Sequence, residues 1–143
     1  MIFGIYDVVG GALSGAFDEE ALIMASAGTV PADAPKGSVY YAAEKLSSGG
    51  DGETELITVR VRAFPPDGMT TGECGRKIIN ALEPLTLGTT PFDAEKHEGK
   101  LYKSYVDVSI TYRLPVFYTR FFDMEKVEGR QVLMSELILT LDV

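Results

Sequence analysis

The chain has 143 residues, of which 45% are hydrophobic and 24% are charged, a composition typical of a folded domain. Its formal net charge is −8, whereas domains that bind nucleic acids usually carry a basic face. A single cysteine and a single histidine exclude an internal disulfide and argue against a Cys/His zinc site within one chain. A catalytic triad would have to use His97, so composition alone indicates no catalytic function.

The apolar N-terminal segment 1–17 differs from a signal peptide, because it lacks Lys and Arg and contains Asp7. It is also too short and too rich in glycine for a transmembrane span. We therefore expect the chain to be cytosolic where it is made. The segment is ambiguous between helix and strand, since its glycines weaken a helix. The next apolar run, 21–25, follows three acidic residues and predicts a short helix.

Strands are predicted where β-branched, aromatic or alternating residues occur. Ser38–Ala43 is rich in β-branched and aromatic residues. Glu55–Ala63 and Tyr102–Arg113 alternate apolar and polar side chains with a period of two, which predicts strands with one buried and one solvated face. The predicted buried residues are Ile57, Val59, Val61, Val106, Val108, Ile110 and Tyr112.

A helix is predicted between these strands, from Thr70 to Glu83. Thr70 and Glu73 have the spacing of a capping box, in which the two side chains satisfy free backbone N–H groups. Pro84 ends the helix.

The remaining segments complete an α+β prediction. Residues 86–99 are interpreted as a loop, while 116–122 and 132–143 are interpreted as further strands. The resulting order predicts an antiparallel or mixed sheet with helices packed on one face. We expect a single domain over 1–143, made of an N-terminal apolar segment and loop (1–37), a core of sheet and helix (38–113) and C-terminal strands (114–143).

The residues that could carry chemistry have simpler structural explanations. Cys74 lies on the apolar side of the predicted helix, so a small core residue is a better interpretation than a nucleophile. His97 lies in a mixed-charge segment without the spacing of a metal site. The glycine-rich stretch 10–15 matches neither a phosphate loop nor a dinucleotide-binding fingerprint. We expect no enzymatic activity, no metal and no cofactor.

Two groups of side chains are candidates for contacts with partners. One is a set of arginines on the polar side of the strands, which either form cross-strand ion pairs or dock a partner subunit. The other is an aromatic group around Arg120, which is either buried on both faces or exposed as an interface, with base stacking a weaker alternative. The candidate interface residues are Arg60, Arg62, Arg113, Phe117, Tyr118, Arg120, Phe121 and Phe122.

The order of elements over residues 38–113 resembles the tail terminator (tail completion) proteins of long-tailed bacteriophages. The resemblance lies in the strands Ser38–Tyr41, Glu55–Ala63 and Tyr105–Arg113, with the helical stretch Gly72–Leu82 between the last two. In that family a long amphipathic helix usually opens the chain. A strand ending in a turn is then followed by a helix and a second strand.

The resemblance implies a structural virion protein without chemistry of its own. Such proteins form a ring, usually of about six subunits, that caps the tail tube and joins it to the neck. The implied partners are further copies of the chain, the tail tube protein and a neck or head-closure protein, with DNA only as cargo. The implied location is the virion, or the host cytoplasm during assembly. An acidic ring would let DNA pass without binding it.

Two alternatives stay open from the sequence. Within the same class, the chain could be another neck, head-closure or tail-tube component. In a different class, it could be a small ligand-binding or enzymatic α+β domain that uses Cys74, His97 and nearby carboxylates.

Overall fold

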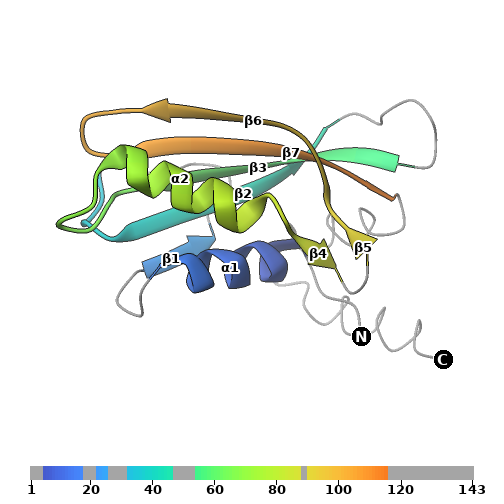
Figure 1. The fold of residues 1–143 in the computed structure, drawn as a ribbon, viewed down its shortest axis with the longest axis horizontal. Coiled ribbons are helices and arrows are strands. Elements are labelled where there is room, and N and C mark those ends of the chain that lie inside the picture. Colours follow the sequence, from blue (N-terminus) through green and yellow to red (C-terminus); the bar gives the residue numbers. More distant parts are fainter. Residues whose placement is uncertain (1–4, 18–21, 26–31, 47–53, 88–89, 116–143) are drawn as a thin grey trace.

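The computed structural model describes residues 5–17, 22–25, 32–46, 54–87 and 90–115. Within them, two helices pack on one face of a sheet, which confirms the predicted α+β class (Figure 1). The helices are α1 (Ile5–Ala16) and α2 (Thr71–Leu82), and the main strands are β1 (Leu22–Ala25), β2 (Ser38–Lys45), β3 (Thr54–Ala63), β6 (Asp93–Leu101) and β7 (Val106–Pro115). Two short strands, β4 (Thr86–Leu87) and β5 (Thr90–Pro91), form a separate pair between α2 and β6.

The five main strands form one mixed sheet in the order β1-β2-β3-β7-β6. Strand β1 runs parallel to β2, and all other neighbours are antiparallel. Strands β3 and β7 are ten residues each and pair over their full length at the centre of the sheet. Strands β1 and β6 are its two edges.

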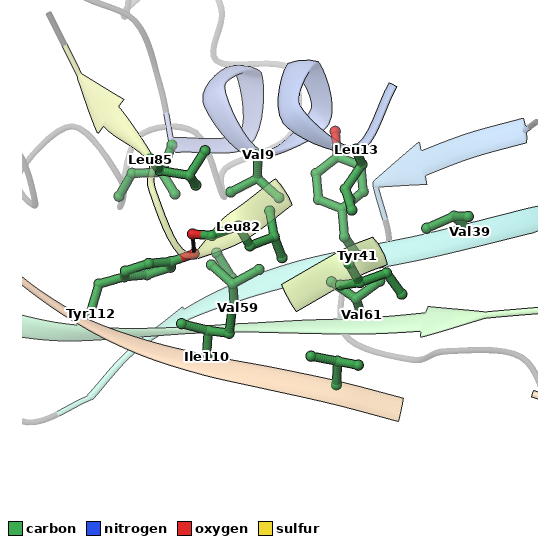
Figure 2. Close-up of a cluster of buried hydrophobic side chains, with 14 of the residues drawn as sticks. Val9, Leu13, Val39, Tyr41, Val59, Val61, Leu82, Leu85, Ile110 and Tyr112 are labelled. Atoms are coloured by element: carbon green, nitrogen blue, oxygen red, sulfur yellow. Dashed lines mark hydrogen bonds between the residues drawn. The ribbon is translucent and has the colours of Figure 1, made fainter. Parts of the chain in front are cut away.

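The core lies between the sheet and the two helices. The alternation predicted in β3 and β7 is confirmed, because all seven residues predicted to be inward-facing are at most 2% exposed. Figure 2 shows Val59, Val61, Ile110 and Tyr112 directed from the sheet toward Val9 and Leu13 of α1 and Leu82 of α2. Burial of these side chains is the main source of stability of the fold.

Helix α2 begins as the sequence predicts. The Thr70 hydroxyl accepts a hydrogen bond from the Glu73 N–H at 3.1 Å, as the capping box predicts, whereas the Glu73 carboxylate accepts from that hydroxyl at 3.2 Å in place of the predicted backbone N–H. Gly75 allows the helix to approach β7 closely, because a Cβ atom there would lie 3.2 Å from a methyl group of Val106. The helix ends before Pro84, also as predicted.

Helix α1 resolves the segment that was ambiguous from its sequence. Ile5, Val9, Leu13 and Phe17 recur every fourth residue and are all at most 9% exposed, so they form one apolar stripe on the core. Gly10 fits beside Tyr41, whose hydroxyl oxygen would be 2.5 Å from a Cβ atom at that position. Gly10 is one of the glycines that made a helix less certain from the sequence. Its close contact with Tyr41 explains why a glycine is needed at this position.

The helix predicted at 21–25 is wrong, because Leu22–Ala25 forms strand β1. A run of four apolar residues has no helical or alternating pattern that distinguishes the two structures. The parallel pairing of β1 with β2 and its contact with α1 decide the outcome.

The loop predicted at 86–99 is also wrong, because it contains β4, β5 and most of β6. Strand β6 is exposed along nearly its whole length, so its sequence shows no alternation of apolar and polar residues. The predicted strand at 102–113 begins later, at Val106, because a tight turn precedes it: the Tyr102 N–H donates to the Tyr105 carbonyl at 2.9 Å. The strands predicted at 116–122 and 132–143 lie outside the described residues.

Candidate functional site

The sheet face opposite the helices is the candidate site, and we call it the outer face. In the part of the chain that the structure describes, both helices pack on the other side of the sheet (Figure 1). Strand alternation and register assign to the outer face three rows of side chains across β2, β3, β7 and β6. The rows are Tyr40–Arg62–Asp107–Lys100, Ala42–Arg60–Ser109–Glu98 and Glu44–Thr58–Thr111–Lys96.

Arg62 forms an ion pair through two hydrogen bonds on this face. Its Nε and Nη2 atoms donate to the two carboxylate oxygens of Asp107 at 2.7 and 2.8 Å. The guanidinium carbon also lies 4.3 Å from the centre of the Tyr105 ring. The hydrogen bonds to Asp107 raise the pKa of Arg62 above its ordinary value. Its side chain is 20% exposed, so this fork-to-fork pair is partly shielded from water.

Arg60 and Arg113 lie on the same face with different partners. Arg60 Nη1 is 3.3 Å from the Glu44 carboxylate in a largely exposed pair. Arg113 donates to Glu95 at 2.5 Å and to the Thr54 hydroxyl at 3.0 Å. The sequence prediction that these three arginines share one polar face is therefore confirmed. The structure also contains their cross-strand ion pairs, which is one of the two interpretations that the sequence left open.

Aromatic residues gather at one end of the outer face, where sequence reasoning did not place them. Tyr102 stacks on Tyr105 with 4.5 Å between ring centres, and Phe64 contacts Tyr105 at 5.3 Å and Tyr40 at 6.3 Å. The signal in the sequence was the pair of tyrosines on either side of a two-residue turn, Lys103-Ser104. The aromatic group predicted around Arg120 (Phe117, Tyr118, Phe121 and Phe122) lies outside the described residues.

A shallow hollow of about 250 Å³ lies between the first two rows of the outer face. Its charged lining alternates in sign, with Arg60, Arg62 and Lys100 beside Glu98 and Asp107. Such a lining offers paired hydrogen-bond donors and acceptors and is suited to another polar protein surface. Among the described residues, no three His, Cys, Asp or Glu side chains are grouped so as to hold a metal ion. In the same ranges, no helix is long and apolar enough to cross a membrane.

Cys74 and His97 are on different elements with different surroundings. Cys74 is fully buried on α2, as predicted for a core residue, and burial raises the pKa of its thiol to about 11. A nucleophilic cysteine needs a lowered pKa instead. His97 is exposed on β6, where a loop was predicted. The acidic segment 93–98 is likewise part of this edge strand and not a loop.

The partly buried Arg62 pair gives a test of the outer face. We expect Arg62→Ala to lower the free energy of unfolding by about 1 kcal/mol, because it removes two charge-assisted hydrogen bonds and a cation–π contact. The matched variant Arg60→Ala should change it by less than about 0.5 kcal/mol, because the Arg60–Glu44 pair is exposed. Urea denaturation of both variants measures the difference. If both variants lost the same free energy of unfolding, the partly buried pair of Arg62 would contribute no more to stability than the exposed pair of Arg60.

Because the pKa of the Cys74 thiol is raised, we expect the free energy of unfolding to depend on pH. The pKa of the thiol is raised on folding, so its contribution to stability is fully present below about pH 9 and is lost as the pH rises toward about 11. We expect the free energy of unfolding to fall more steeply over this range in the wild type than in Cys74→Ala. Denaturation at several pH values, with each variant compared to itself at pH 7, measures the slope. Identical slopes would contradict the assignment.

Comparison with protein-family models gives no match, and comparison with curated proteins gives none either. The fold defines the chain as an α+β protein with helices on one face of a mixed sheet.

Proposed function

We propose that this protein is a structural virion subunit of the tail-terminator type, which assembles into a ring that caps the tail tube and joins it to the neck. The observation that carries the proposal is the outer face, a broad sheet surface with paired charges and an aromatic end. Arginine and tyrosine are enriched in protein–protein interfaces, and arginine binds carboxylates through two parallel hydrogen bonds.

Charge balance supports the use of this face for contacts between copies. The whole chain has a formal charge of −8, so identical subunits repel each other on average. On the outer face the cationic side chains of the three rows are matched by neighbouring carboxylates, as in the pairs Arg62–Asp107 and Arg60–Glu44. The electrostatic repulsion of a second acidic subunit is therefore weakest at this face.

The order of elements also supports the proposal. A helix with an apolar stripe precedes the sheet, and a strand, a turn, a helix and further strands follow, in the order expected from the resemblance. The same observations fit a different neck or tail-tube subunit, so the position in the virion is part of what the experiment must decide. A ligand-binding or enzymatic domain is less well supported, because the buried thiol of Cys74 has a raised pKa.

The test is the assembly state of the purified chain alone and with tail tubes. Light scattering and negative-stain electron microscopy should show a ring of about six subunits that binds one end of the tube and stops its growth. Arg60→Glu should reduce ring formation, while Lys77→Glu, on the exposed side of α2, should not. Unchanged circular dichroism would show that both variants are folded. A chain that forms no ring, with or without tubes, contradicts the proposal.

A further inference from the structure

Strand β6 leaves one side of its backbone open at the edge of the sheet. It is nine residues long and pairs with β7 on one side, and among the described residues no strand pairs with the other side. The hydrogen bond from the Tyr102 N–H to the Tyr105 carbonyl fixes which residues bond to β7. Because bonded and non-bonded pairs alternate in an antiparallel ladder, Lys100 and Glu98 bond to β7, while His97, Gly99 and Leu101 direct their N–H and C=O groups outward.

The charges of β6 are self-complementary around Gly99. If two copies pair antiparallel with a two-fold axis at Gly99, Glu98 of each copy lies opposite Lys100 of the other. The outward-directed groups of His97, Gly99 and Leu101 then face each other across the axis and can form a continuous ladder. Two opposite-charge pairs therefore form in this register.

The neighbouring registers that keep the hydrogen bonds are less favourable. An axis at Glu98 places Glu98 opposite Glu98 of the second copy, and Lys96 opposite Lys100. An axis at Lys100 places Lys100 opposite Lys100 of the second copy. Like charges directly opposite each other are destabilising. An axis at His97 pairs Lys96 with Glu98, but it extends the ladder across the bulge between Ala94 and Lys96.

Pairing in this register also covers exposed apolar residues. Leu101 is 65% exposed and Tyr102 is 40% exposed, and they are the exposed large hydrophobic residues of the described chain. With the axis at Gly99, Leu101 lies opposite His97 of the second copy and Tyr102 lies opposite Lys96. Pairing therefore covers both apolar side chains and leaves no like charges opposed.

We propose that β6 is a dimer interface at which two copies of this chain pair antiparallel around Gly99 and join their sheets into one. The charges on β6 keep this edge from pairing with unrelated strands, and only a partner with the reversed charge order matches it. A two-fold interface closes on itself, so this contact stops at two copies. Its backbone lies at the edge of the sheet, where Glu98 and Lys100 end two rows of the outer face, and it does not depend on the proposed ring.

The test is a charge swap across the axis, read as mass by light scattering and analytical ultracentrifugation. In the Arg60→Glu background, in which ring formation is expected to be reduced, the chain should still form a dimer. Glu98→Lys and Lys100→Glu should each weaken it by about tenfold or more, because both cross-strand pairs become repulsive. An equimolar mixture of the two variants should dimerise again, since one chain then carries lysines and the other glutamates at both positions. The double variant E98K/K100E should also form a dimer.

Matched controls separate this result from general charge effects. Asp33→Lys and Lys77→Glu make the same charge changes at exposed positions away from β6 and should leave the dimer intact. A wild-type monomer at its highest soluble concentration, or single variants that dimerise normally, would overturn the proposal. A mixture of the two variants that remains monomeric would overturn it as well.

A cross-link provides a second readout that does not require a change of charge. In a Cys74→Ala background, Gly99→Cys gives the only thiol, and the axis places the two copies within the Cα separation that a disulfide spans. We expect oxidation to yield a covalent dimer, whereas Lys77→Cys in the same background should not cross-link. Loss of this dimer with intact rings would reject the β6 interface alone, and intact β6 dimers without rings would reject only the proposed function.

Discussion

Replacing Tyr112 by alanine is expected to lower the free energy of unfolding by about 4 kcal/mol, one of the largest effects of a single substitution in this chain. Tyr112 is fully buried on β7, its ring packs edge-on against Phe92 at 5.2 Å, and its hydroxyl donates to the Leu82 carbonyl near the end of α2 (Figure 2). The substitution removes the ring and leaves that carbonyl without its donor. A loss of this size is a large part of the total stability of a typical domain.

Tyr112→Phe separates the two contributions. It keeps the ring and removes only the hydroxyl, so we expect a loss of about 1–2 kcal/mol. Burial, with the nearby charge of Glu83, raises the pKa of Tyr112 above its ordinary value, so the hydroxyl remains a donor at neutral pH. Urea denaturation of both variants provides the measurement. If the phenylalanine variant lost as much stability as the alanine variant, the hydroxyl and not the packing of the ring would account for the loss.

Replacing Leu13 by alanine is expected to cost about 3 kcal/mol. Leu13 is fully buried, and Figure 2 shows it on the side of α1 that faces the sheet. Truncation leaves a cavity between α1 and the sheet, and the cost depends on how far the surroundings can close it. Thermal or urea denaturation measures the loss.

The adjacent Ser14 is the control for this prediction. Ser14 is exposed, so Ser14→Ala should be neutral or stabilise the protein by up to about 0.5 kcal/mol through helix propensity. If the Leu13 and Ser14 variants lost stability equally, α1 would not pack on the core through the stripe of Ile5, Val9 and Leu13.

The sequence was sufficient to predict the centre of the fold. Strands β3 and β7 each have one face in the core and a more exposed face with polar side chains, of which Thr58 is buried, so their alternation identifies the strands and most of the buried residues. The capping box of Thr70 and Glu73 predicts the start of α2 for an equally local reason. The candidate arginines could be placed on one polar face because they follow the same alternation.

The edges of the sheet and the ion pairs were decided only by the tertiary structure. Strand β6 is exposed on both faces, so its sequence has no alternation, and its hydrogen bonds to β7 across the turn at Tyr102–Tyr105 make it a strand. Strand β1 is too short to show a period, and its pairing with β2 defines it. Arg62 meets Asp107 from 45 residues away, since strand register, which depends on the whole sheet, brings them together.

For the charge and the single cysteine, too, the sequence determined one part of the answer and the tertiary structure the other. A net charge of −8 and one cysteine determined which classes of site were improbable. Packing determined where those charges balance and where the thiol lies. The outer face pairs its charges locally, and α2 holds Cys74 in the core. Composition sums charges over the chain, whereas an interface depends on which charges the fold places side by side.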